Sequence, residues 1–113
     1  MTPFQRDEVE DREAWAREVA ALRAEAREPE RRLIALGQLG DLLRIGGDGE
    51  EAVWVLTEAL TLSREREDEG RIRANTIRLA TALQYGGAHE RARTMLEGLV
   101  ERIEGSSAVS YTH

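Results

Sequence analysis

Residues 36–59 read LGQLGDLLRIGGDGEEAVWVLTEA, and this order of residue types predicts two helices joined by a tight turn. Apolar residues recur at helical spacing both before and after the Gly46-Gly47 pair. Glycine often ends helices, because it takes the left-handed conformation without a Cβ penalty. Asp48 then stands where an N-cap is expected, with Glu51 three residues later, as in a capping box. The stretch therefore predicts a helical hairpin.

Similar patterns over the rest of the chain predict an all-α protein of about five helices. The first helix is marked by an apolar stripe at i, i+4, i+7 and i+11, made of Trp15, Val19, Leu22 and Ala26. Pro29 stops that helix or begins the next one. The expected helices cover residues 6–28, 30–45, 49 to about 68, 68 or 70 to 85, and 88–104.

Composition excludes several classes of function. The 113 residues have a formal net charge of −6, which argues against general attraction to nucleic acid or anionic membranes. Cysteine is absent, so disulfides, thiolate zinc sites and cysteine nucleophiles are excluded. No group of residues has the spacing of a catalytic centre or a metal-binding loop. We therefore expect a protein that is not an enzyme and uses no cofactor or metal. Its acidic N-terminus lacks the apolar core of a signal peptide, which predicts a cytoplasmic protein.

The chain contains an internal repeat. Placed 40 residues apart, the stretches Ile45–Ala52 and Tyr85–Ala92 share the glycine pair, a Glu and an Ala. At the same offset Leu39 meets Leu79, Leu43 meets Leu83, Leu56 meets Leu96, and Ala59 meets Leu99. The chain is thus expected to form one domain over residues 6–104, with a lone helix at 6–28, a first repeat at 30–68 and a second at 69–104. Residues 1–5 are expected to be a disordered lead-in, and 105–113 a flexible tail or the start of a missing third repeat.

The repeat resembles the tetratricopeptide repeat (TPR) family. The residues that carry the resemblance are Leu36, Leu39, Gly40, Leu43, Gly47-Asp48, Ala52, Leu56 and Ala59 in the first unit, and Thr76, Leu79, Ala80, Leu83, Gly87, Ala92, Leu96 and Leu99 in the second. The family's small residues lie where helices approach closely. The units here are longer than the usual length of about 34 residues, and the closing proline is absent. We assign the extra residues to a charged extension at 63–70 that lengthens the second helix of the first unit.

The resemblance implies antiparallel helix hairpins stacked into a right-handed α-solenoid. The first helices of the units would line a concave groove that binds a peptide or helix of a partner protein. The expected partner-binding residues are Ile34, Gln38, Asp41 and Arg44 in the first unit, and Ala74, Ile77, Arg78, Thr81 and Gln84 in the second. This surface is mixed, so we expect a partner with both apolar and charged groups. Gly37 and Asp41 stand where some family members carry the Lys and Asn of a carboxylate clamp, and no such clamp is expected.

The fifth helix predicts self-association. It is apolar on two sides, and no amphipathic cap follows it, whereas the end unit of a solenoid needs a polar cover. The expected contact is a homodimer through Met95, Leu99 and Ile103. Two alternatives to a groove-binding module therefore stay open. One is a structural module whose purpose is the homodimer, and the other is a regulatory fragment of a larger signalling or transcription protein.

The two tryptophans receive different interpretations. Trp15 lies on the apolar stripe of the first helix and is expected in the core. Trp54 lies off the Ala52–Leu56–Ala59 stripe. We expect it to cover the neighbouring unit or the first helix, and the alternative is an exposed aromatic contact for a partner.

Overall fold

The computed structural model describes residues 3–111, and it describes side chains from residue 8 to residue 105. Over this range the chain forms five α-helices and no strand, which confirms the all-α prediction. The helices are α1 (Pro3–Glu25), α2 (Arg32–Ile45), α3 (Gly49–Glu65), α4 (Glu69–Tyr85) and α5 (His89–Tyr111). None of the described helices is both long and apolar enough to cross a membrane.

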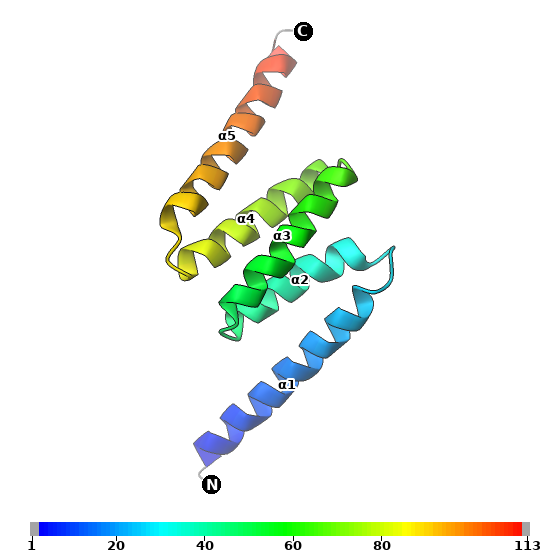
Figure 1. Ribbon diagram of the computed structural model, residues 1–113, viewed down its shortest axis with the longest axis vertical. Coiled ribbons are helices and arrows are strands. Elements are labelled where there is room, and N and C mark those ends of the chain that lie inside the picture. Colours follow the sequence, from blue (N-terminus) through cyan, green and yellow to red (C-terminus); the bar gives the residue numbers. More distant parts are fainter. Residues whose placement is uncertain (1–2, 112–113) are drawn as a thin grey trace.

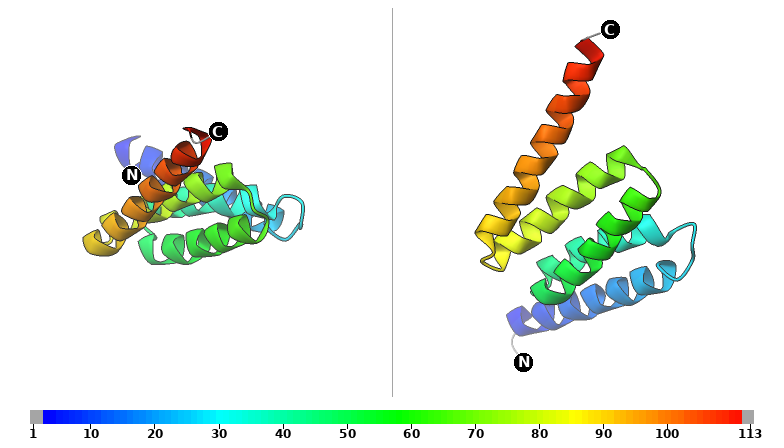
Figure 2. Two further views of the ribbon diagram at one scale, coloured as in Figure 1. Left: turned by 90° about the horizontal axis from the view of Figure 1, so that it is seen from above. Right: turned by 45° about the horizontal axis from the view of Figure 1, so that its top comes forward.

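The helices follow one another along the molecule, with α1 at one end and α5 at the other (Figure 1). Each helix packs against the next one in the chain, and α2 also contacts α4. Their directions alternate, so that α1, α3 and α5 run one way and α2 and α4 return (Figures 1 and 2). This arrangement brings α2 and α4, which are far apart in sequence, onto one shared face.

The connections after α2, α3 and α4 are the same turn, and the helices that follow them begin 20 residues apart. In each turn the third residue donates its amide hydrogen to a carbonyl five residues back: Asp48 to Leu43 (2.8 Å), Asp68 to Ser63 (3.0 Å) and Ala88 to Leu83 (2.8 Å). The middle residue of each turn has a positive φ, which is 89° at Gly47, 54° at Glu67 and 87° at Gly87. These are features of Schellman-type helix ends.

This turn corrects the expected end of the third helix. α3 ends at Glu65 and not near Asp68, and residues 66–68 form the connection. α3 and α4 each contain 17 residues. The 40-residue offset therefore comes from helices of equal length and short turns, and no charged extension lengthens α3. This turn contains no glycine. Glu67 occupies the left-handed position that glycine fills in the other two turns.

Other helix ends also differ from the sequence prediction. α1 covers Pro3–Glu25 where residues 6–28 were expected, and α2 begins at Arg32. α5 continues through Gly105 to Tyr111, although the Gly-Ser-Ser sequence was expected to end it. A glycine costs a helix only about 1 kcal/mol, and no proline follows to stop it. Residues 3–5 and 105–111 thus lie within helices, and residues 1–2 and 112–113 are outside the described range.

The core forms where small residues let the helices approach closely. Ala52, Leu56 and Ala59 of α3 are fully buried. A Cβ added to Gly40 of α2 would lie 2.3 Å from the side chain of Leu56, much closer than a Cβ contact allows. The apolar stripe predicted for the first helix is also found, since Val19 and Ala26 are buried.

Trp15 connects α1 to the end of α2. Its ring packs against the main core cluster, and its Nε1–H donates a hydrogen bond of 2.7 Å to the carbonyl of Leu42. A Cβ added to Gly46 would lie 2.3 Å from the indole ring. The prediction that Trp15 belongs to the core is therefore confirmed, and Gly46 has a second role as the surface on which Trp15 lies.

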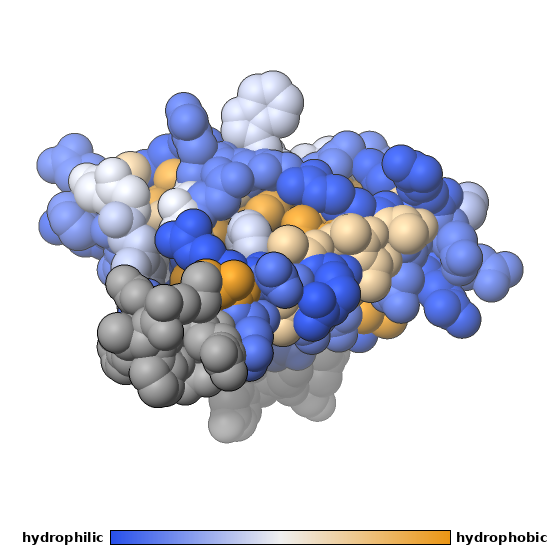
Figure 3. Space-filling model, turned by 90° about the horizontal axis from the view of Figure 1, so that it is seen from below, coloured by the Kyte–Doolittle hydropathy of each residue, from blue (hydrophilic) through white to orange (hydrophobic). Residues whose placement is uncertain are grey.

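The exposed surface of α1 carries small apolar residues among its charged ones. It exposes five alanines, which are Ala14, Ala16, Ala20, Ala21 and Ala24. Figure 3 views the molecule from its α1 end and shows apolar residues as a broken strip between hydrophilic ones. Packing of α1 therefore uses one narrow stripe, and the rest of its described surface mixes charged residues with alanines.

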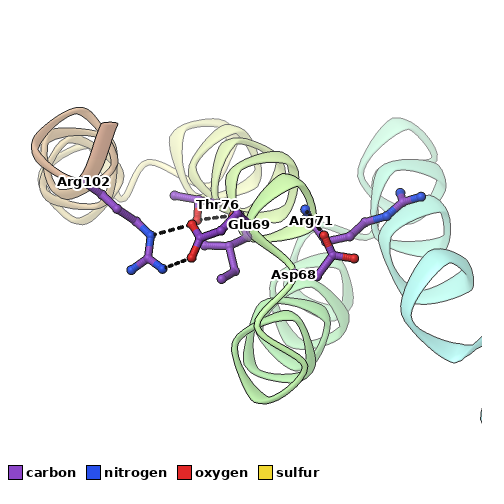
Figure 4. A network of polar contacts seen from close by, with 6 residues as sticks. Asp68, Glu69, Arg71, Thr76 and Arg102 are labelled. Carbon is purple, nitrogen blue, oxygen red and sulfur yellow. Dashed lines mark hydrogen bonds and ion pairs between the residues drawn. The ribbon is translucent and has the colours of Figure 1, made fainter. Parts of the chain in front are cut away.

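Ion pairs join neighbouring helices at the surface. In Figure 4 the guanidinium of Arg102 on α5 makes two contacts with the carboxylate of Glu69 on α4, one of them 3.0 Å from Nε to Oε2. The hydrogen bond from Arg102 lowers the pKa of the Glu69 carboxyl, and the charge of Arg102 acts in the same direction. The pair therefore stabilises the fold above the unfolded pKa of this glutamate. Its contribution is lost as the pH falls through the lowered folded value.

Replacing Glu67 with glycine should stabilise the protein. A residue with a side chain in the left-handed conformation costs roughly 1 kcal/mol more than glycine does, and the glutamate side chain is exposed. We expect Glu67→Gly to raise the free energy of unfolding by about 0.5–1 kcal/mol, measured by urea denaturation. Glu67→Ala is the matched control and should give little gain, since alanine keeps the Cβ penalty. Equal gains in both variants would show that the backbone conformation is not the cause.

Candidate partner-binding face

The nine residues predicted to contact a partner all lie on α2 or α4, the two helices that share a face. Four of them are exposed, namely Ile34, Gln38, Ile77 and Gln84. The other five are half-buried, namely Asp41, Arg44, Ala74, Arg78 and Thr81. We call the surface formed by these nine residues, together with Ile45 and Tyr85, the α2/α4 face.

Arg78 and Asp41 form an ion pair across this face. Arg78 Nε on α4 lies 2.9 Å from Asp41 Oδ2 on α2, and both side chains are about two-thirds buried. Partial burial strengthens such a pair relative to a fully exposed one. The charge of Arg78 is therefore already satisfied within the chain, so this residue holds α2 and α4 together and is a poor candidate for binding a partner's carboxylate.

A polar chain continues from this pair into the core. Arg78 Nη1 donates to Asn75 Oδ1 at 3.1 Å, and Asn75 Nδ2 donates to Ser63 Oγ on α3 at 2.9 Å. The Ser63 hydroxyl donates in turn to the carbonyl of Ala59 at 2.7 Å. Asn75 and Ser63 are almost fully buried, and each has the hydrogen bonds that burial requires.

Gly37 gives this polar chain the space it needs. A Cβ at Gly37 would lie 2.8 Å from Arg78 Nη1 and 3.0 Å from Asn75 Oδ1. The sequence places Gly37 at a groove-facing position, where some TPR proteins carry a residue of a carboxylate clamp. Its structural role is to let two polar side chains of α4 lie directly against the backbone of α2.

Arg44 differs from Arg78. Its guanidinium carbon lies 5.3 Å from the centre of the Tyr85 ring, in cation–π contact. Its Nε is buried and has no hydrogen-bond partner in the described part of the chain. None of the ion pairs found among residues 8–105 includes Arg44. This cation is therefore held in place by an aromatic ring and keeps its charge available.

Exposed apolar side chains lie along the same two helices as Arg44. Ile34 is 46% exposed, Ile77 is 51% exposed, and Ile45 and Tyr85 are more exposed still. The sequence interpretation missed Ile45 and Tyr85 as parts of this face. A signal was present, because the two residues coincide at the 40-residue offset and directly precede the glycine pairs. The face thus combines a fixed cation with apolar surface.

The three residues predicted for self-association differ in their exposure to solvent. Leu99 is only 8% exposed, because it packs within the chain itself, so it offers almost no area to a second copy. Met95 is half-buried, and Ile103 is 42% exposed. On the same helix Val100 is 51% exposed, and it was not among the predicted contacts.

Trp54 does not cover the neighbouring unit or α1, so the favoured interpretation of this residue was wrong. Its side chain is 80% exposed near the middle of α3. On a helix it groups with residues four positions away and not with the buried stripe. It points into solvent because α3 already fills its contacts with α2 and α4 through other residues.

Within the described residues, no group of three or more His, Asp or Glu side chains could hold a metal ion. The α2/α4 face itself offers two guanidiniums, a carboxylate, two amides, two hydroxyls and apolar groups. Comparison of the chain with protein families, with curated proteins and with solved structures gave no match. The geometry of the face is therefore the basis for its functional interpretation.

Proposed function

We propose that this chain is a non-catalytic, TPR-like α-solenoid that binds a segment of another protein on its α2/α4 face. The regular order of helix contacts, the repeated turns and the small residues Gly40 and Ala80 support the repeat architecture. The observation that carries the functional part is Arg44, a fixed cation without a carboxylate partner among the described residues, on the same two-helix face as exposed Ile34 and Ile77.

The occupant of this face is a short peptide or helix with an acidic group and apolar side chains. Its carboxylate pairs with the guanidinium of Arg44, and a charge-assisted hydrogen bond of this kind is stronger than a neutral one. Its apolar side chains cover Ile34 and Ile77. Exposed apolar groups around a charged or aromatic anchor are typical of protein-binding surfaces.

The proposal is tested by titration with a short synthetic peptide of alternating leucine and aspartate, followed by NMR. Backbone signals of α2 and α4 should shift, and the same peptide with arginine in place of aspartate should leave them unchanged. Arg44→Glu should weaken binding at least tenfold, which corresponds to about 1.4 kcal/mol, because an attraction becomes a repulsion.

Two further variants make this test specific. Arg91→Glu on α5 is the matched control, since it makes the same charge change away from the α2/α4 face, and it should bind the acidic peptide as the unaltered chain does. Arg78→Glu is not a suitable probe, because it would break the Asp41 pair and lower the stability of the fold. Unchanged affinity in Arg44→Glu, or equal loss in Arg91→Glu, would contradict the proposal.

A homodimer is the second candidate function, and one observation favours it. At the 40-residue offset Val100 and Ile103 of α5 correspond to Leu60 and Ser63 of α3, which are buried beneath α4. Val100 and Ile103 have no such cover from the described helices and are about half exposed. A second copy of the chain would cover them through its own α5. A molar mass of one chain by light scattering, at tens of micromolar, would rule this candidate out.

A further inference from the structure

The most exposed large hydrophobic side chain among those described is Trp54, which lies on α3 outside the α2/α4 face. Glu50 and Glu58 stand one helical turn before and after it, on the same stripe. Burying an aromatic side chain of this size is strongly favourable. An indole that is 80% exposed between two carboxylates is therefore a feature that the packing of the chain does not explain.

The surface around Trp54 is a shallow depression of about 780 Å³. Its charged lining consists of the carboxylates of Asp48, Glu50, Glu51 and Glu58, together with the guanidinium of Arg91 on α5. Val53 and Val55 add apolar surface. Four acids against one base give the lining a negative balance, and the electron-rich face of the indole also favours a cation.

Two of the four carboxylates have partners in the chain. Glu51 pairs with Arg23 of α1, and Glu58 pairs with Arg32 of α2. Glu50 takes part in none of the ion pairs found between residues 8 and 105. Asp48 accepts only a long hydrogen bond of 3.4 Å from the backbone of Glu51. Free negative charge is therefore concentrated at the N-terminal end of α3, one turn from the indole.

We infer that the Trp54 depression is a second docking site, and that its partner is a basic segment of another protein. An arginine or lysine of that segment lies on the indole face of Trp54 and pairs with Glu50, and neighbouring apolar side chains contact Val53 and Val55. This site shares no residue with the α2/α4 face, whose partner is acidic. The chain would thus bind oppositely charged segments on two separate surfaces.

The two tryptophans make this site directly measurable. The indole N–H of Trp15 is bonded to the Leu42 carbonyl and serves as an internal reference. In a titration with a short peptide of alternating leucine and arginine, the Trp54 indole signal should shift in proportion to peptide bound, and the Trp15 signal should stay in place. The same peptide with aspartate in place of arginine should not shift the Trp54 signal.

Substitutions in and around the depression should change the affinity for the arginine peptide in predictable directions. Trp54→Ala should abolish binding of the arginine peptide, followed through the signals of Val53 and Val55, and it should leave the helical circular dichroism unchanged because the side chain is exposed. Glu50→Gln should weaken binding several-fold, and Arg91→Gln should strengthen it, since it removes a competing positive charge. Glu65→Gln, an exposed acid at the far end of α3, is the matched control and should have no effect.

Several results would overturn this inference. Binding of the arginine peptide by Trp54→Ala as tightly as by the unaltered chain would exclude the indole as the contact. Equal binding of the aspartate peptide at Trp54 would exclude charge recognition. A Trp54 signal that shifts with protein concentration alone, before any peptide is added, would show that a second copy of the chain occupies the depression.

Discussion

Replacing Gly40 with alanine should destabilise the protein by about 1–3 kcal/mol, the range expected for overpacking a well-filled core. The added Cβ would lie 2.3 Å from both Cγ and Cδ2 of Leu56. Leu56 is fully buried, so its side chain has no free space into which it can turn. The two helices would have to separate, and chemical denaturation monitored by circular dichroism measures the loss.

Two comparisons separate this effect from that of adding a methyl group to any helix. Gly98→Ala on α5 is the control, because nothing lies within 4 Å of its added Cβ, and alanine should stabilise that helix by up to about 1 kcal/mol. Adding Leu56→Ala to Gly40→Ala should cost less than the sum of the single changes, since the clash then disappears. Additive losses would mean that Gly40 and Leu56 are not in the contact described.

Replacing Gly46 with alanine should loosen α1 from the remaining helices. The new Cβ would lie 2.3–2.5 Å from three atoms of the Trp15 indole, so the ring has to leave its position and give up the hydrogen bond to Leu42. A displaced ring and a lost hydrogen bond together should lower the free energy of unfolding by about 1–3 kcal/mol. In a Trp54→Phe background, the fluorescence of Trp15 should shift to longer wavelength as the indole becomes hydrated.

Gly86→Ala is the matched control for this variant. Gly86 has the same place in its turn, with φ of −84° against −78° at Gly46. The nearest atoms to its added Cβ are two carbonyl oxygens at 3.6 Å, which is ordinary contact. Equal losses of stability in the two variants would attribute the effect to the turn itself and would remove the special role of Trp15.

Much of the helical layout could be predicted from local signals. The glycine pairs and the Asp48 cap correctly marked the ends of α2 and α4 and the start of α3, because helix ends depend on backbone conformation and on the first unpaired amides. The turn at residues 66–68 was missed for the same reason, since a glutamate fills the left-handed position. The cap at Asp68 was the remaining signal, and its side chain does accept a hydrogen bond from the Arg71 amide.

The candidate site was predictable only in part. Assigning residues to one side of α2 or α4 needs helical periodicity alone, and the nine predicted residues do lie on those helices. Whether a charge is free depends on distances between helices, which periodicity does not contain. Arg44 and Arg78 therefore look equivalent in the sequence. In the structure, however, Arg78 forms an ion pair with Asp41, and Arg44 lies over the ring of Tyr85. The exposure of Trp54 likewise depends on the positions of α1 and α5 in the fold, which helical periodicity does not give.

The order in which the helices contact one another also determines how the protein should fold. Nearly all packing joins helices that are neighbours in sequence, with α2 and α4 as the exception. Such local contacts cost little loop-closure entropy, which favours rapid folding. The close backbone contacts of α1 and of α5 are each with a single helix, so these two helices should open and close on their own while the central three helices stay intact. The highest free energies of local opening are therefore expected at the contacts among α2, α3 and α4.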